Sequence, residues 1–310
     1  MKSVRGLALV SALLLPFFLS GCFLVFTRRK LPVPKTPTVV QTVTPDELVE
    51  RLNQRWDGLQ TLSAKVQIAA TVLKSSEGLA KDYTTFRAMI LIRKPEDLGV
   101  FGQMPVVHTW MFYLVSNGQN FTAYIPSKSK AYRGSDSSTK NIPPEEGPVS
   151  SAKSVVDQLL SLRPGMFFNA MVVRGLSPED YYSVTADTET MEDPSKKHLY
   201  SMPEYILSIT HHVPGSRRDI PVRVITFNRD DLLPHQQDIY DENGNVQTQV
   251  TYTDYQDFGS VKFPAIITMK RPMEGLQLVL SVESVKENIK LSDDQFEVKL
   301  PPDTRIQNLE

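Results

Sequence analysis

The sequence contains a single cysteine, Cys22, in 310 residues. An exported chain in an oxidising compartment would therefore have no second thiol for an internal disulfide. An excess of charge of one sign is missing too, because 34 basic residues stand against 35 acidic ones. With a formal net charge of −1, the chain has no global field that would draw it to nucleic acid. We therefore predict no nucleic-acid partner.

Motifs that assemble catalytic or metal sites are also absent from the sequence. It has no HExxH, GxSxG, P-loop or paired CxxC. His211 and His212 are adjacent, and adjacent residues of a strand point to opposite faces, so we predict a hydrogen-bonded His211 rather than a metal ligand. "DENGN" at 241–245 has too few spaced carboxylates for a calcium loop and predicts a turn. We predict no enzyme activity, no metal and no cofactor.

The amino terminus has the layout of a secretory signal. A short cationic region, residues 1–5, precedes an uncharged run from Gly6 to Phe18. The next four residues, Leu-Ser-Gly-Cys at 19–22, resemble the lipobox of bacterial lipoproteins. That resemblance implies cleavage before Cys22 and acylation of its thiol, so that covalent acyl groups anchor the mature chain to a membrane.

A transmembrane helix is the alternative interpretation of the same residues. Leu7 to Phe26 make up about 20 nearly uncharged residues, enough to cross a bilayer. Three basic residues at 28–30 would then lie on the exported side, against the positive-inside tendency. The lipoprotein interpretation is favoured. Phe23, not aspartate, would follow the acylated cysteine, which by resemblance to enterobacterial lipoproteins favours the outer membrane over the inner one.

The domain organisation follows from this start. Residues 1–21 are predicted to be the signal peptide, and residues 22–44, with prolines at 32, 34 and 37, an extended tether. Residues 45–310 are predicted to form one folded body that faces the periplasm.

The first half of the body predicts one helix and several strands. Thr44, Pro45 and Glu47 are typical of a helix start, and Gly58 of its end. Apolar residues alternate with polar ones over 62–73 and 86–92, which predicts strands. Further strands are expected between 98 and 116, interrupted by "GQMPV", and at 121–125 after the turn "SNGQ". Residues 134–148 predict a surface loop.

In the centre of the chain the apolar residues change from alternation to helical spacing, and after it the alternation returns. "SSAKSVVDQLLSLRPG" at 150–165 predicts an amphipathic helix, and "MFFNAMVV" at 166–173 a second, short one. Strands are expected at 181–187, 204–213, 221–229, 235–241, 246–254, 261–271 and 276–286. The short links predict an antiparallel meander, and an antiparallel sheet this long is expected to curl while the apolar helices cover its dry face. The fold class is therefore mainly β, a curved antiparallel sheet in a half-open barrel covered by helices.

This order of elements resembles the lipoprotein-localisation family, which includes the carrier LolA and the receptor LolB. The resemblance spans roughly residues 45–305. It is carried by the lipobox and by "ELVERLNQRWDGLQTLSAKVQI", "FRAMILIRKP", "LVSNGQNFTAYIP", "VVDQLLSLRPG" and "DDQFEVKLPPDTRI". It implies an apolar cavity that receives acyl chains under a helical lid. It also implies a membrane-contact loop in "FGQMPVV", with Met104, Pro105 and Val106 at its tip.

The apolar strand faces and the Met/Phe cluster "GMFFNAM" supply the candidate cavity and lid. Flexible thioethers and aromatic rings suit promiscuous apolar binding, although ordinary helix-on-sheet core is the more frequent use of such a stripe. The predicted cavity and lid residues are Ile68, Ile90, Trp110, Met166, Phe167, Met171, Phe263 and Leu278.

Two functions from different classes remain open at this point. The first is a membrane-anchored lipoprotein that binds acyl chains of lipoproteins or other envelope lipids and aids their transfer at the outer membrane, without covalent chemistry. A periplasmic carrier is a possible partner. The second is a structural or sensing lipoprotein that uses the same barrel as an interaction platform in an envelope complex, with a filled core.

Overall fold

The computed structural model describes residues 39–74, 79–82, 85–104, 109–136, 164–192 and 199–309. The chain divides into two compact units, one made of Pro37–Glu189 and Met202–Glu310, the other of Met1–Thr36 and Thr190–Ser201. Apart from the strand ends at 190–192 and 199–201, all described residues belong to the unit made of Pro37–Glu189 and Met202–Glu310. The predicted signal peptide, Cys22, most of the tether and residues 150–163 of the helix expected at 150–165 lie outside the described residues.

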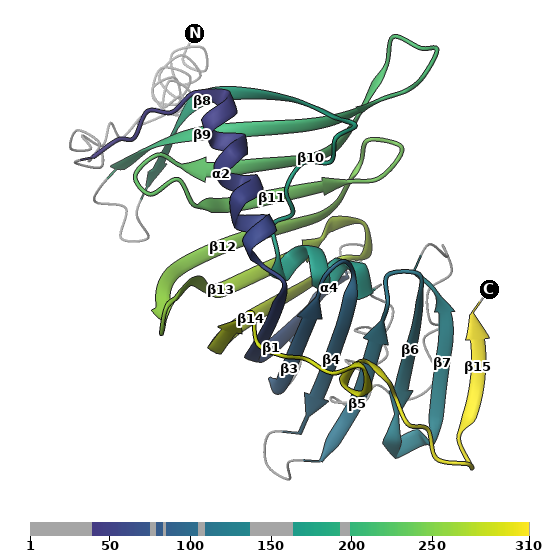
Figure 1. The fold of residues 1–310 in the computed structure, drawn as a ribbon. Helices are drawn as coiled ribbons and strands as arrows, with labels where there is room; N and C mark the ends of the chain where they lie inside the picture. Colours follow the sequence, from purple (N-terminus) through teal and green to yellow (C-terminus); the bar gives the residue numbers. More distant parts are fainter. Residues whose placement is uncertain are drawn as a thin grey trace, which may run out of the picture. The chain divides into compact units, whose positions relative to one another are not determined.

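The described chain is mainly β and forms a curved, open sheet, as the sequence predicted (Figure 1). Its strands are β1 (Thr61–Lys74), β2 (Leu79–Asp82), β3 (Phe86–Arg93), β4 (Asp97–Gln103), β5 (Trp110–Ser116), β6 (Asn120–Ile125), β7 (Lys130–Ser135), β8 (Asp180–Glu192), β9 (Leu199–His212), β10 (Asp219–Asn228), β11 (Pro234–Tyr240), β12 (Val246–Phe258), β13 (Val261–Arg271), β14 (Leu276–Glu287) and β15 (Arg305–Leu309). The order across the sheet is β15-β7-β6-β5-β4-β3-β1-β14-β13-β12-β11-β10-β9-β8, and β2 pairs with β1.

The pairing of β1 with β14 joins the two halves of the sheet. These strands are antiparallel over most of their length, from the pair Leu62 and Glu287 to the pair Val72 and Leu276. The other pairs from β7 to β9 are antiparallel as well. The predicted meander is therefore confirmed, and the first strand of the body lies beside the last strand of the meander.

Helix α2 (Pro45–Gly58) begins where the sequence predicted. The hydroxyl of Thr44 accepts a hydrogen bond from the Glu47 amide, and the Glu47 carboxylate accepts one from the Thr44 amide, which completes a capping box. Its buried face consists of Leu48, Val49 and Leu52. These side chains pack on apolar residues of β9 and β10, which α2 crosses in Figure 1.

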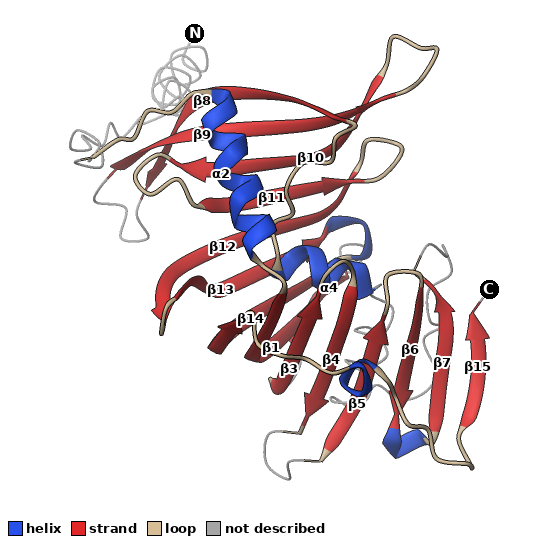
Figure 2. Ribbon diagram, viewed as in Figure 1, coloured by secondary structure: helices blue, strands red, loops and turns tan. Residues whose placement is uncertain are grey.

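Helix α4 (Pro164–Met171) is the short helix expected in "MFFNAMVV", and it begins two residues earlier because Pro164 and Gly165 open it. Proline is suited to a first turn, where its missing amide hydrogen has no helical partner anyway. Met166, Phe167, Phe168, Ala170 and Met171 are all buried. Among the described residues, α2 and α4 are the α-helices, and Figure 2 shows them in blue.

The pair β7 and β15 was not predicted. β15 runs parallel to β7, from the pair Arg305 and Lys130 to the pair Leu309 and Gly134. Each strand is short, and neither alternates cleanly between apolar and polar residues. β7 pairs with β6 as well as with β15, and these partner strands supply the hydrogen bonds that define both strands, so the local pattern gave no signal.

The segment before β15 covers the other face of the sheet. Leu291 packs with Leu91, Phe101 and Val115 in a small apolar cluster that is separate from the main core. Arg93 fixes this segment from the side, since its guanidinium lies 2.7 Å from Asp293 and stacks over the Phe296 ring at 4.7 Å. The sheet is therefore covered on both faces near β3, β4 and β5.

Candidate functional site

The apolar interior lies between α4 and the strands β1, β3–β7 and β12–β14. Of the residues predicted for the cavity and lid, the main core contains Ile68, Ile90, Met166, Phe167, Met171, Phe263 and Leu278. Alternation brought the strand residues to one face, and the sheet curvature brought α4 against them. The structure thus assembles seven of the eight predicted residues, and their role in binding stays a prediction.

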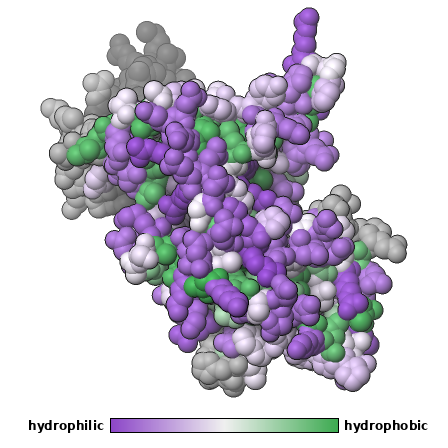
Figure 3. Space-filling model, viewed as in Figure 1, coloured by the Kyte–Doolittle hydropathy of each residue, from purple (hydrophilic) through white to green (hydrophobic). Residues whose placement is uncertain are grey.

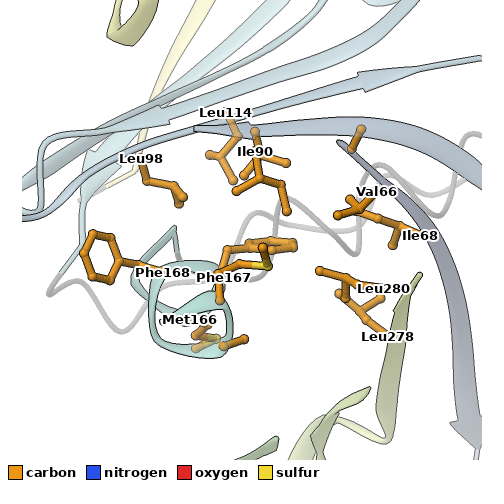
Figure 4. Packing of buried hydrophobic residues seen from close by; sticks show 14 of the residues in the cluster. Val66, Ile68, Ile90, Leu98, Leu114, Met166, Phe167, Phe168, Leu278 and Leu280 are labelled. Carbon is orange, nitrogen blue, oxygen red and sulfur yellow. The ribbon is translucent and has the colours of Figure 1, made fainter. Parts of the chain in front are cut away.

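Phe167 lies at the centre of this interior. Its side chain is 1% exposed, and side chains from β1, β3 and β14 point toward it (Figure 4). Ile90 and Leu280 are fully buried beside it, and Phe168 extends toward Leu98 from the same helix. The space predicted as a cavity is therefore filled by the helix itself in this structure.

Trp110 is the exception among the predicted cavity residues. Its ring meets those of Phe101 and Tyr113, which lie on the opposite face of the sheet, and 39% of the residue is exposed. A register shift between Gly102 and Gln103 interrupts the β4–β5 ladder at this point. A bulge changes which face the following residues occupy, so simple alternation placed Trp110 wrongly.

Two buried side chains that the sequence analysis did not single out hold α4 and its connection. Arg271 is 7% exposed; its guanidinium contacts Met166 Sδ in α4 and the Glu274 carboxylate, and lies 3.4 Å from Thr248 Oγ1. Gln237 donates a hydrogen bond of 2.9 Å to the backbone oxygen of Asn169. In the sequence, both are polar residues at strand positions that face inward, and this was the signal that could have identified them.

Arg223 fixes the backbone that leaves α4. It is 9% exposed and donates hydrogen bonds of 2.9 and 2.8 Å to the carbonyl oxygens of Arg174 and Gly175. Burial lowers the pKa of Arg223. Arg174 in turn pairs with Glu96 at 2.9 Å and stacks over the Phe168 ring at 4.5 Å. The end of α4 is thus tied to β10 and to the β3–β4 turn by charged side chains.

A pocket of about 320 Å³ opens at the edge of the filled interior. Its apolar part includes Met171, Val261 and Phe263, and α2 contributes Arg55 to its rim. Arg55 donates a hydrogen bond of 3.0 Å to the carbonyl oxygen of Lys262. Glu287 also lines the pocket. Burial raises the pKa of Glu287, and the positive charge of Arg55 lowers it. The pocket therefore combines an apolar base, continuous with the core, and a cationic rim.

The predicted membrane-contact loop connects β4 and β5. Met104, partly exposed, donates its backbone amide to the carbonyl oxygen of Thr109 at 2.9 Å. This bond closes the base of a hairpin loop. Pro105 and Val106 lie outside the described residues, so the membrane contact stays a prediction.

An apolar groove lies on the opposite face of the sheet. It has a volume of about 570 Å³ and is bounded by Phe101, Tyr113 and Tyr124 on one side and by residues 294–301 on the other. The rings of Tyr113 and Tyr124 stack with centroids 6.0 Å apart. Burial raises the pKa of Tyr113.

The adjacent histidines lie at the exposed end of β9. His212 Nδ1 lies 2.9 Å from Asp219 Oδ1 and both residues are exposed; His211, also exposed, pairs with Ile220 in the ladder. Within the described part of the chain, one group offers three metal-ligand atoms within 4.8 Å of one another: Glu189, Glu204 and His235. No spacing in the sequence pointed to it, because its members come from three separate strands.

The pKa of Glu204 is raised to about 7, mainly by burial, and the neighbouring carboxylates of Glu189 and Asp187 contribute in the same direction. Burial also lowers the pKa of His235, against the opposite effect of Glu189 and Asp230. Both groups are thus neutral more often than exposed ones would be at the same pH.

Glu204→Gln is expected to remove a pH dependence of stability. The pKa of Glu204 is raised from an ordinary 4.5 to about 7 on folding, so the folded state binds more protons between these values and loses stability as pH rises through them. One such group contributes a slope of at most about 1.4 kcal/mol per pH unit. Urea unfolding in EDTA at several pH values between 4.5 and 8 measures it. An identical slope in the variant would contradict the assignment.

Hydrophilic side chains predominate on the face of the molecule seen in Figure 3, and hydrophobic ones form small patches there. Among the residues that the structure describes, no helix is long and apolar enough to cross a membrane.

Comparison with known proteins returns structures only. No family model and no curated protein matches the chain. A LolA superfamily protein from Nitrosomonas europaea is 14% identical, with 83% of this chain and 99% of that chain covered and a TM-score of 0.48. A DUF1329 family protein from Desulfovibrio piger is 16% identical, with 81% and 95% covered and a TM-score of 0.47.

A third similar structure is a putative outer membrane lipoprotein-sorting protein domain from Vibrio parahaemolyticus. It is 11% identical, with 81% of this chain and 94% of that chain covered and a TM-score of 0.44. A LolA superfamily protein and a lipoprotein-sorting protein domain are thus among the structures to which this chain is similar.

Proposed function

We propose that this chain is a membrane-anchored lipoprotein that binds acyl chains of lipoproteins or other envelope lipids and passes them on at the outer membrane. Acyl transfer of this kind needs no covalent chemistry, because a difference in affinity between successive sites is sufficient. The observation that carries the proposal is α4. This eight-residue helix inserts methionine and phenylalanine side chains into the interior of a curved sheet.

In the proposed cycle α4 occupies the space that an acyl chain takes when it enters. The side chains of Met166, Phe167 and Met171 bury apolar surface against the strands. An acyl chain would bury a similar apolar surface in their place, so the exchange would change the free energy of burial little. Methionine side chains adapt to partners of varied shape. The pocket at Met171 and Phe263 is the proposed entrance, where the cationic rim would meet an anionic head group.

The direct test of the proposed entrance is site-specific photo-crosslinking. Residues 23–310 would be exported to the periplasm and purified without detergent, with a photoreactive phenylalanine analogue at Val261, which lines the pocket. The matched control carries the analogue at Trp110, which is also partly exposed but lies on the opposite face. Illumination with a diacylated lipopeptide should label Val261 and not Trp110.

Native mass spectrometry of the same preparation measures uptake without a label. Added lipopeptide is expected to give a complex of one chain with one lipopeptide. A clean unbound mass together with no crosslink at Val261 would end the carrier proposal. Crosslinks at both positions in equal yield would mean that the lipid adheres to apolar surface without entering the interior.

Met104→Glu is expected to weaken membrane contact without loss of stability. Met104 lies at the base of the β4–β5 loop, and a carboxylate there would have to leave water when the loop enters a bilayer. We expect binding of the unacylated chain to lipid vesicles to fall by about tenfold or more, from a cost of roughly 2 kcal/mol or more for a charge in the bilayer. Vesicle flotation measures binding, and an unchanged melting temperature is the control. Equal flotation of both chains would refute the loop's role.

The anchor itself belongs to the proposal. Acylation of Cys22 would hold the body at the membrane, and Phe23 as the next residue supports the outer membrane. Cys22→Ala should release the chain from the membrane fraction or leave it uncleaved. Mass spectrometry of the mature amino terminus tests the acylation directly.

A second candidate is an interaction platform in an envelope complex. The filled interior and the apolar groove of Phe101, Tyr113 and Tyr124 favour it. Under this function Tyr124→Ala would abolish partner binding, while the lipopeptide experiments would give an unbound mass.

A further inference from the structure

A second cluster of functional groups lies on the strands β8, β9 and β11, away from the apolar interior. We propose that Glu189, Glu204 and His235 form a binding site for one divalent transition-metal ion of the zinc type. Their ligand atoms lie within 4.8 Å of one another, and His235 Nε2 lies 3.1 Å from Glu204 Oε1. Two ligands at about 2.0–2.2 Å from a tetrahedral zinc ion are separated by roughly 3.3 Å, so small side-chain rotations bring the set to coordination distance.

The strand register explains why these residues meet. Tyr205 and Leu207 of β9 pack under α2, so Glu204 points to the other face of the sheet. On β11, Pro234 pairs with Phe227 and Gln236 pairs with Thr226, which leaves His235 as the extra residue of a bulge. A bulge re-aims a side chain, and here the imidazole is directed at Glu204.

A buried oxygen without a hydrogen-bond partner is the independent sign that points to a ligand. Glu204 is 5% exposed, and within the described residues its Oε1, 3.1 Å from His235 Nε2, has no hydrogen-bond partner. His235 Nδ1 and Asn228 Oδ1 are likewise buried and unpartnered there. Asn228 pairs directly with Glu204 across β9 and β10, so both side chains lie on one face. A buried carboxylate oxygen without a partner is costly, and a cation bound by Glu204 would satisfy it.

The charge of the surroundings selects a cation. Asp187 and Glu189 place negative charge near Glu204, and Glu189 and Asp230 place negative charge near His235. Two carboxylates and one imidazole suit zinc and its neighbours in the transition series, whereas calcium and magnesium prefer oxygen ligands alone. The ion would tie β8, the edge strand, to β9 and β11.

The test is zinc retention by the untagged full-length chain, purified in mild detergent. After incubation with zinc chloride and gel filtration, wild type should retain about one zinc per chain by elemental analysis. Glu204→Gln and His235→Ala should each weaken binding by more than about tenfold. His212→Ala is the matched control, because it removes an exposed histidine that has a single carboxylate partner. It should retain zinc as wild type does.

Two further readouts separate binding from folding. In EDTA, Glu204→Gln should be at least as stable as wild type above pH 7, so its loss of zinc cannot come from unfolding. Cobalt added to wild type should give a visible absorption band that Glu204→Gln lacks, and zinc should displace it. No retained zinc in wild type, or retention unaffected by Glu204→Gln and His235→Ala, overturns the proposal.

Discussion

Phe167→Ala is expected to lower the free energy of unfolding by about 3–5 kcal/mol, the range for deletion of a buried phenylalanine ring. Phe167 is 1% exposed and lies between α4 and the side chains of β1, β3 and β14. The ring's contacts come from the helix and from strands far apart in the sequence, so the cavity left behind can collapse only in part. Urea unfolding followed by circular dichroism measures the change.

Gly165→Ala in the same helix is the matched control. A methyl group added there meets no atom of the described residues within 4 Å, and alanine favours helix more than glycine does. We expect a result between no change and a gain of about 1 kcal/mol. If Phe167→Ala cost less than about 1 kcal/mol, α4 would not be packed in solution as it is here, and the interior would be open at rest.

Arg223→Ala is expected to destabilise the protein by about 2–4 kcal/mol. The substitution removes both hydrogen bonds to the carbonyl oxygens of Arg174 and Gly175, and each buried carbonyl left without a partner costs about 1–3 kcal/mol. Because these carbonyls follow α4, hydrogen exchange of α4 amides should also become faster. Chemical denaturation and exchange mass spectrometry give the two readouts.

Arg223→Met separates the hydrogen bonds from the volume of the side chain. Methionine fills much of the same space but donates nothing, so it should still lose most of the stability. Arg218→Ala, an exposed arginine that precedes the same strand, should change stability by less than about 0.5 kcal/mol. A methionine variant as stable as wild type would mean that the two bonds contribute nothing net.

The helix starts, the strand bounds and the apolar strand faces could be predicted from the sequence. The capping residues before α2 fixed its start, because the cap hydrogen bonds join residues three apart in the chain. Alternation located β1, β3 and β13 within one or two residues of their observed bounds, and identified the face that carries Ile68, Ile90 and Phe263. The fold class followed, since many short-linked strands with one dry face can bury it only by curving around helices.

The contacts between residues far apart in the chain depend on the tertiary structure and could not be predicted from the sequence. The bulge beside Gln103 moved Trp110 out of the interior, and the bulge at His235 brought an imidazole to Glu204; neither leaves a periodic trace in the sequence. The parallel pair of β7 and β15 and the buried Arg223 and Arg271 depend on partners far away in the chain. The physical reason is the range of the interactions: helix caps and alternation act within a few residues, whereas register, burial of charge and the filling of the interior by α4 are settled only when distant segments pack together.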